Sequence, residues 1–155
     1  MDYIDILFFH SPFGHAEIED DVWQALDDLR NSGKIRFAGH SISKLEDTRG
    51  MAEHWAGERK IDVVQVVYSL MNREASGLIS QPGEQVIGVV ARESLANGFL
   101  SGVIARETEF PKNNLNAPYS RDEIDECVSY VEHLENPLKK YIQTITQESL
   151  IWFFG

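Results

Sequence analysis

One segment near the amino terminus constrains the fold most strongly, Asp2-Tyr-Ile-Asp-Ile-Leu-Phe-Phe-His10-Ser-Pro12. Residues 4 to 9 are mostly apolar and bulky, without the alternation of a strand that has one wet face. Such a run is typical of a strand buried on both faces, as in a parallel sheet covered by helices. Pro12 cannot extend a ladder, so the strand should end near His10. His10 is therefore expected at the carboxyl end of a buried strand, where α/β proteins build their sites.

The length of the chain limits the architecture. With 155 residues, 43% of them hydrophobic, the chain can form one domain with a real core, so we expect residues 1–155 to be a single domain. A barrel of eight strand-helix units usually needs about 250 residues. The chain is therefore either a smaller fold or part of such a barrel.

The charge balance restricts the partners. Lys and Arg total 14 against 25 Asp and Glu, which gives a formal net charge of −11. We therefore expect no nucleic acid as a general partner. An anionic cofactor stays compatible with this charge, because a few backbone amides and one Arg can bind it locally.

Cysteine content and hydropathy indicate the compartment. The single cysteine, Cys127, excludes an internal disulfide framework and fits a reducing compartment. Its neighbours Ile124, Val128 and Val131 favour helix packing over a reactive thiol. The chain shows neither a signal-peptide pattern nor an apolar run of about 18 residues, so we expect a cytoplasmic protein without a membrane partner.

Strands and helices alternate along the chain. Further strands are expected at 35–42, 61–68 and 86–91, with helices at 19–34 and 43–59 and a short helical turn at 74–80. Capping boxes predict helix starts at Ser43 and Ser120. Residues 103–119 look irregular and exposed, and Pro137 should break the last helical region. This alternation predicts parallel pairing with right-handed crossovers.

Several residues are candidates for function on their own chemistry. Gly39 leaves room close to the backbone, and His40 and Ser41 end the second strand. Gln65 lies within the third strand, where a buried amide satisfied by backbone is the simpler interpretation. The loop 92–102, rich in Gly, Asn and Ser, can offer amides to an anion, although most such loops are only connections.

Four motifs in register resemble the aldo-keto reductase family: the first strand with His10, Trp23-Gln-Ala-Leu with Gly33-Lys-Ile-Arg-Phe-Ala-Gly39, Val64-Gln-Val-Val-Tyr68 with Asn72-Arg73, and Ala91-Arg-Glu-Ser-Leu-Ala-Asn-Gly-Phe-Leu-Ser-Gly102. Residues 144–154 are similar to the helix before the family's eighth strand. The resemblance implies a partial (β/α)8 TIM barrel made of strands four to seven, with helices on one outer side.

The resemblance also implies a function and a site. Family members are NADP(H)-dependent oxidoreductases that transfer hydride between cofactor and a small carbonyl or alcohol substrate. His10 matches the active-site histidine, and Ser41 and Gln65 match the residues that hold the nicotinamide carboxamide. Arg92 falls beside the nicotinamide ring, and Leu95 and Asn97 lie in the loop that passes the pyrophosphate. No metal is implied.

The family's catalytic Tyr, Lys and Asp come from earlier strands, and they have no match in this sequence. We therefore expect a truncated, catalytically incomplete chain, and whether it is an enzyme stays open. The alternative is a non-catalytic family member that acts through protein-protein interaction, and self-association through open sheet edges is expected in either case. A metal hydrolase using His10, His15, His40 and His54 is disfavoured, because the spacing fits no zinc motif.

Overall fold

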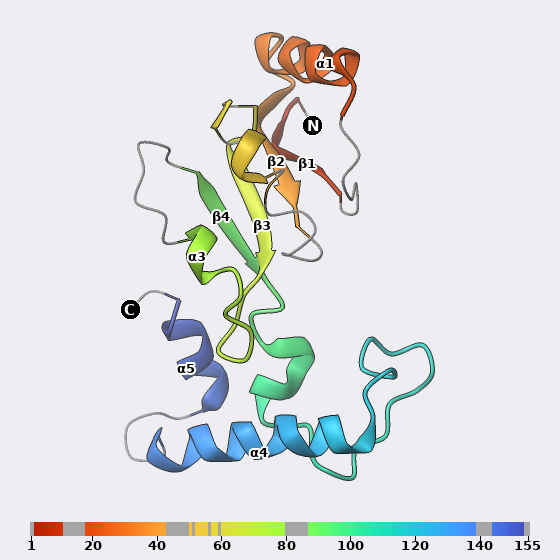
Figure 1. The fold of residues 1–155 in the computed structure, drawn as a ribbon, viewed down its shortest axis with the longest axis vertical. Coiled ribbons are helices and arrows are strands. Elements are labelled where there is room, and N and C mark those ends of the chain that lie inside the picture. Colours follow the sequence, from red (N-terminus) through yellow and green to blue (C-terminus); the bar gives the residue numbers. More distant parts are fainter. Residues whose placement is uncertain are drawn as a thin grey trace. The chain divides into compact units, whose positions relative to one another are not determined.

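The computed structural model describes residues 2–10, 18–42, 50, 52–55, 57–58, 60–79, 87–138 and 144–153. Figure 1 shows the fold as a ribbon coloured along the sequence. Its elements are β1 (Ile4–Phe9), α1 (Asp20–Asn31), β2 (Ile35–Ser41), β3 (Val63–Val67), α3 (Ser76–Ile79), β4 (Gly88–Arg92), the 3-10 helix η1 (Ala96–Ser101), α4 (Arg121–Leu138) and α5 (Ile145–Ile151). The capping box predicted at Ser43 lies outside the described residues.

The chain divides into two compact units. The first comprises Met1–Tyr68 and Arg73–Arg92, and the second comprises Ser69–Asn72 and Glu93–Gly155. The strands belong to the first unit, and η1, α4 and α5 belong to the second. The expectation of a single domain over residues 1–155 stays a prediction.

The four strands of the first unit form one parallel sheet in the order β1-β2-β3-β4. Phe9 aligns with His40 of β2, and Ser41 aligns with Gln65 of β3. Gln65 in turn aligns with Val90, and Val67 with Arg92 of β4. The predicted parallel pairing is therefore confirmed, because consecutive strands lie side by side and point the same way.

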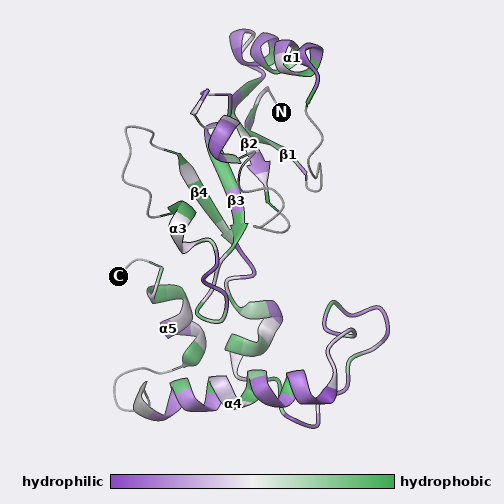
Figure 2. Cartoon of the chain, viewed as in Figure 1, coloured by the Kyte–Doolittle hydropathy of each residue, from purple (hydrophilic) through white to green (hydrophobic). Residues whose placement is uncertain are grey.

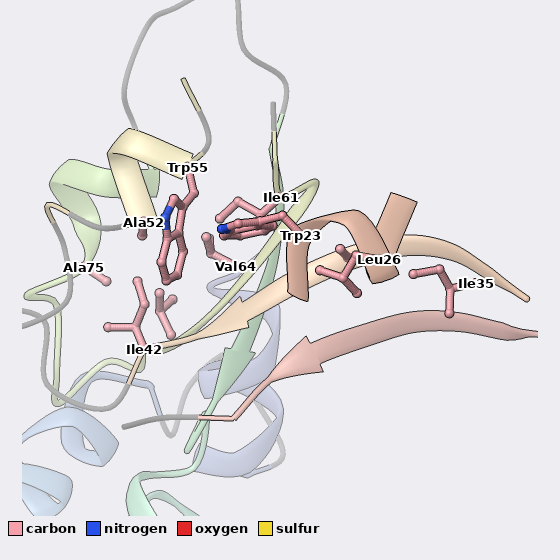
Figure 3. Packing of buried hydrophobic residues seen from close by; sticks show 11 residues of the cluster. Trp23, Leu26, Ile35, Ile42, Ala52, Trp55, Ile61, Val64 and Ala75 are labelled. Atoms are coloured by element: carbon pink, nitrogen blue, oxygen red, sulfur yellow. The ribbon is translucent and has the colours of Figure 1, made fainter. Parts of the chain in front are cut away.

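One face of this sheet carries the core of the first unit (Figure 3). Ala38, Ile42, Val64 and Val66 pack with side chains from α1, the helical residues 52–55, and α3 with the turn residue before it, namely Trp23, Leu26, Ala52, Trp55, Ala75, Leu78 and Ile79. The Trp23 and Trp55 rings meet edge to face with their centroids 5.3 Å apart. We call this the helix face. α1, the helical residues 52–55 and α3 all contact the helix face, as the resemblance to aldo-keto reductases implies.

The opposite face of the sheet, defined by Phe8, Gly39, Ser41, Gln65 and Arg92, is packed differently. A Cβ added to Gly39 would come within 2.5 Å of the Phe8 ring. The space expected at Gly39 is thus filled by that ring. Residues aligned across parallel strands share a face, so the register places these five residues together.

Arg30 and Asp62 link the ends of α1 and β3. Arg30 Nη2 lies 2.6 Å from Asp62 Oδ2, and the same oxygen accepts from the Ala38 backbone N–H at 2.9 Å. The Asp62 carboxylate thus pairs the Ala38 N–H, which lies one residue before the β2–β3 ladder begins at Gly39. This ion pair fixes where α1 ends relative to the sheet.

In the second unit, η1, α4 and α5 pack on a separate cluster that includes Leu70, Phe99, Leu100, Ile124, Val128, Val131 and Ile145. Figure 2 shows the alternation of hydrophilic and hydrophobic residues along α4 that lets one side enter this cluster. The predicted capping box is confirmed, because Glu123 Oε2 accepts from Ser120 N and the Glu123 N–H donates to Ser120 Oγ.

Two expectations for the second unit need correction. The predicted break at Pro137 is not observed, because α4 includes Pro137 and Leu138, the last residues described before 144. The segment 103–119 is irregular as expected, but Asn116 within it is buried. None of the helices in the described ranges is both long and apolar enough to cross a bilayer.

Candidate active site

Three of the predicted site residues lie at the carboxyl ends of β1, β2 and β4, and the fourth lies in the middle of β3. His10 directly follows β1, Ser41 is the last residue of β2, and Arg92 is the last residue of β4. Gln65 is central in β3 and aligns with Ser41. Parallel strands bring these ends to one edge of the sheet, which explains why residues distant in sequence meet.

The register places Ser41, Gln65 and Arg92 on the same face. Ser41 aligns with Gln65, and His10 follows β1, one residue after the Phe9 that aligns with His40. Arg92 aligns with Val67, two residues beyond Gln65, and therefore shares its face. His10 is exposed and Ser41 is buried. The row lies on the face opposite the helix face.

Two hydrogen bonds tie this row together. Ser41 Oγ donates to Gln65 Oε1 at 3.5 Å. Arg92 Nη2 donates to the Ile42 carbonyl at 3.4 Å, which carries the guanidinium from β4 across β3 to the end of β2. A hydroxyl, an amide and a guanidinium are thus grouped near the carboxyl ends of the strands, with donors and acceptors both represented.

The other two predicted residues, Leu95 and Asn97, belong to the second unit. Asn97 (φ 51°) and Gly98 (φ 98°) interrupt η1 with left-handed backbone, and Ala96 is also left-handed (φ 48°). Non-glycine residues seldom adopt this conformation, and such strain gathers at ligand-binding segments. Successive N–H groups in a run of this kind can form a concave anion site. This left-handed backbone therefore fits the expectation that the loop 92–102 can bind an anion.

Asn116 is a residue that sequence reasoning missed. Its side-chain Nδ2 donates to the Asn97 carbonyl at 2.9 Å, and its own backbone N–H donates to Asn114 Oδ1 at 2.8 Å. The Asn-x-Asn spacing was the available signal, because Asn side chains favour such local turns. Nothing in the local pattern indicates the longer contact to Asn97.

His40 lies on the helix face, away from the row. The side chain is fully buried, its ring meets Trp55 edge to face at 4.9 Å, and neither ring nitrogen has a hydrogen-bond partner within the described residues. Burial lowers the pKa of His40 below its ordinary value of 6.5. The side chain is thus held neutral in an apolar core, a role that differs from the zinc ligand considered from sequence.

Acid should destabilise the first unit through His40. The unfolded chain takes up a proton near pH 6.5 and the folded chain only at lower pH, so unfolding is favoured as pH falls below about 6.5. The loss is at most about 1.4 kcal/mol per pH unit until the folded pKa is reached. Urea unfolding at pH 7.5 and 5.5 should show this loss, and His40→Leu should remove it. The exposed control His54→Gln should keep it; an unchanged slope in His40→Leu would assign the loss to another group.

The described residues bear on the metal site considered from sequence. Within those ranges, no three His, Cys, Asp or Glu side chains converge closely enough to hold a metal ion. His15 lies outside them. Cys127 is partly buried against the hydrophobic cluster of the second unit, and burial raises the pKa of its thiol. Both observations fit the helix-packing role expected from the sequence.

Comparison with known proteins gives the architecture its context. The chain is similar to the glycerol dehydrogenase AKR11B4 from Gluconobacter oxydans, with a TM-score of 0.74 and 21% identity over 98% of this chain and 46% of that one. It is also similar to the aldo-keto reductase AKR11C1 from Bacillus halodurans in its apo form, with a TM-score of 0.57 and 23% identity over 81% of this chain and 41% of that one. The search of curated proteins found no match.

These likenesses confirm the fold expected from sequence. The chain spans less than half the length of either solved relative, and its four parallel strand-helix units correspond to part of a (β/α)8 barrel. The sequence profile described as the Aldo/keto reductase family matches residues 1–154. Because that match covers nearly the whole chain, this protein belongs to the aldo/keto reductase family.

Proposed function

We propose that the chain supplies the nicotinamide and pyrophosphate contacts, and the active-site histidine, of an NADP(H)-dependent carbonyl or alcohol oxidoreductase, and that it is catalytically incomplete alone. The observation that carries the proposal is the row of Ser41, Gln65 and Arg92 on one sheet face, with His10 at the carboxyl end of β1 in the same sheet. Membership of the family supports the reaction class. When bound, NADPH would supply the hydride.

Ser41 and Gln65 suit a carboxamide. A primary amide presents one carbonyl acceptor and two N–H donors, and a hydroxyl beside a second amide can satisfy both kinds. The two side chains stand on neighbouring strands with their oxygens 3.5 Å apart, so one planar group can reach both. Ser41 is buried, which strengthens the preference for a fully paired ligand group.

His10 and Arg92 suit the reacting end of the ligand. An imidazole at the mouth of the row can donate a hydrogen bond to a substrate carbonyl oxygen and stabilise the charge that develops there. The Arg92 guanidinium is planar and permanently charged, so it can lie against an aromatic ring or pair with a phosphate. Its bond to the Ile42 carbonyl holds it toward the row.

Taken by itself, the loop of the second unit suits an anion such as a pyrophosphate. The pyrophosphate has several acceptor oxygens and no donors, and of the left-handed residues Ala96 and Gly98 already donate their N–H groups to the Glu93 and Leu95 carbonyls at 2.7 and 2.9 Å, so the Asn97 N–H is the donor that this proposal assigns to the anion. Backbone N–H groups can meet that requirement even in a chain with a net charge of −11. Leu95, which precedes the run, would line the same loop.

A non-catalytic role is the second candidate. The observation that favours it is the exposure of large apolar side chains on the sheet, among them Phe37 and Val90 of the face that carries the row. Exposed apolar groups of this kind mark surfaces that another polypeptide covers. In this reading the chain acts through protein-protein interaction and the row is a remnant.

NADPH titration of the purified chain, followed by calorimetry, tests the proposal. We expect saturable binding, and we expect Gln65→Leu to weaken it about tenfold, because an unpaired amide group costs about 1–3 kcal/mol. Gln24→Leu makes the same change at an exposed site on α1 and should bind as the unaltered chain does. Absence of NADPH binding, or equal affinity in the Gln65 and Gln24 variants, would favour the non-catalytic role.

A further inference from the structure

We infer that Asn116 is a positioning residue that holds the strained loop 93–102 in the conformation required for the cofactor pyrophosphate. This inference rests on the proposed function, because it assigns the loop the anion contact. Asn116 lies 19 residues from Asn97 in the sequence, and both belong to the second unit.

The loop has a conformation that needs outside support. Glu93, Ala96 and Asn97 all have positive φ without being glycine. Each such residue costs conformational energy and persists only where surrounding contacts fix it. Within the loop, the Gly98 and Leu100 N–H groups both donate to the Leu95 carbonyl, at 2.9 and 3.1 Å. These bonds close the turn, but they leave the Asn97 carbonyl to a partner from elsewhere.

Asn116 provides that partner. Its amide Nδ2 donates to the Asn97 carbonyl at 2.9 Å, and only 4% of the residue is exposed. The peptide unit is planar, so fixing the Asn97 oxygen also fixes the direction of the Gly98 N–H on the other side of the same bond. The Asn116 contact on the carbonyl and the Gly98 bond to the Leu95 carbonyl thus hold the two sides of the central peptide of the left-handed run.

The Asn116 side chain is itself fixed by its surroundings. The Asn116 backbone is anchored by Asn114 Oδ1 on one side and by the Tyr119 N–H, which donates to its carbonyl at 3.1 Å, on the other. The Tyr119 ring lies 5.4 Å from that of Phe99 in η1. The segment carrying Asn116 and the loop thus pack as one body within the second unit.

The chemistry of Asn116 also argues against a simple packing role. Its Oδ1 is buried without a hydrogen-bond partner among the described residues. A buried, unpaired oxygen is unfavourable, and an apolar side chain would avoid it. The donation to Asn97 is the one polar contact of this side chain in the described structure that explains an amide at this position.

Asn116→Asp tests the role, because it keeps the shape and exchanges the donor for an acceptor. At pH 8 the carboxylate would face the Asn97 carbonyl, and we expect NADP⁺ affinity to fall about tenfold relative to the unaltered chain. Burial at this position should raise the pKa of the new carboxyl, so at pH 5.5 its protonated form can donate again and the ratio should return toward one. Nicotinamide mononucleotide, which lacks the pyrophosphate bridge, should change less than about twofold. The exposed Asn113→Asp should match the unaltered chain throughout.

Amide hydrogen exchange gives a readout that needs no ligand. Protection of the Gly98 and Leu100 N–H groups should drop in Asn116→Asp and stay in Asn113→Asp. If Asn116→Asp does not fold, as judged by circular dichroism, Asn116→Ser replaces it, with the same expected losses but no recovery at pH 5.5. Equal NADP⁺ affinity and equal protection in the Asn116 and Asn113 variants would overturn this inference alone. No NADP⁺ binding by the unaltered chain would remove the proposed function and this role with it.

Discussion

The chain by itself should reduce a reactive aldehyde with NADPH about 10² to 10⁴-fold more slowly than an intact aldo-keto reductase. That range is the usual contribution of a positioned acid or base. His10 can polarise a carbonyl, but the resemblance assigns proton donation to a Tyr that has no match in this sequence. A bound and polarised carbonyl without a proton donor should therefore turn over slowly.

Tyr3, Tyr130 and Lys60 do not replace the missing acid. Tyr3 precedes β1, whereas His10 follows it, so the two stand at opposite ends of one strand. Tyr130 donates its hydroxyl to the Leu70 carbonyl in the second unit. Lys60 lies 2.9 Å from Glu58 and over the Trp23 ring, ahead of β3. None of these three contacts brings an acid to the row.

NADPH oxidation at 340 nm with 4-nitrobenzaldehyde measures this rate, with an intact family member as the positive control. Titration with NADPH in parallel shows whether a low rate reflects the lack of a proton donor or a failure to bind the cofactor. A rate close to that of the control would mean that another group donates the proton. In that event His10→Ala would show whether the observed turnover depends on His10.

The purified chain should self-associate through the outer strands of its sheet, β1 and β4. Of the large side chains there, Ile4 is 44% exposed and Val89 is 40% exposed. Beside β1, a cavity of about 330 Å³ is lined by apolar residues of β1 and α1: Leu7, Phe8, Phe9, Val22, Ala25, Leu26 and Leu29. An exposed strand edge next to an apolar groove is a template for a second copy.

The balance of forces favours association. Burial of apolar surface contributes about 25 cal/mol per Å², and a standard interface buries about 1,600 Å² in total. The charge of −11 opposes contact between copies, but physiological salt screens that repulsion beyond about 8 Å. Short-range apolar contact therefore outweighs the repulsion, and dimers or larger species should dominate at micromolar concentration.

Sedimentation velocity decides the state of the chain. Ile4→Lys, at the outer strand, and Val22→Lys, in the groove, should each shift the distribution toward the 17.6 kDa monomer. Leu115→Lys introduces the same charge at a side chain that is 83% exposed in the second unit, and it should leave the distribution unchanged. A stable monomer of the unaltered chain, or equal effects of all three variants, would contradict association through this edge.

The strands and helix starts were readable from the sequence because their causes are local. Continuous apolar runs marked β1 and β3, and the Ser120–Glu123 capping box marked the start of α4 within one residue. Carboxyl-end placement of His10 and Ser41 followed from strand ends alone. The roles of the six site residues stay predictions, since they come from resemblance.

The remaining features depend on contacts between distant residues, so no local pattern could give them. The Arg30–Asp62 ion pair joins residues 32 apart, and the Asn116–Asn97 bond joins residues 19 apart. The burial of His40 depends on Trp55, which reaches it from another element. The left-handed φ values of Glu93 and Ala96 run against the preferences of those residue types, so propensity predicts the opposite.

The short excursion Ser69–Asn72 has a consequence for how the chain can be divided. Ser69 and Asn72 close it with reciprocal backbone hydrogen bonds of 2.9 and 3.2 Å, and Leu70 within it enters the cluster of the second unit. A polypeptide that starts at Glu93 would therefore lack a side chain of its own interior and the carbonyl that Tyr130 binds. One that stops at Arg92 would carry an apolar residue with nothing left to pack against. The segments of the two units alternate along the sequence, so no single truncation point yields one complete unit.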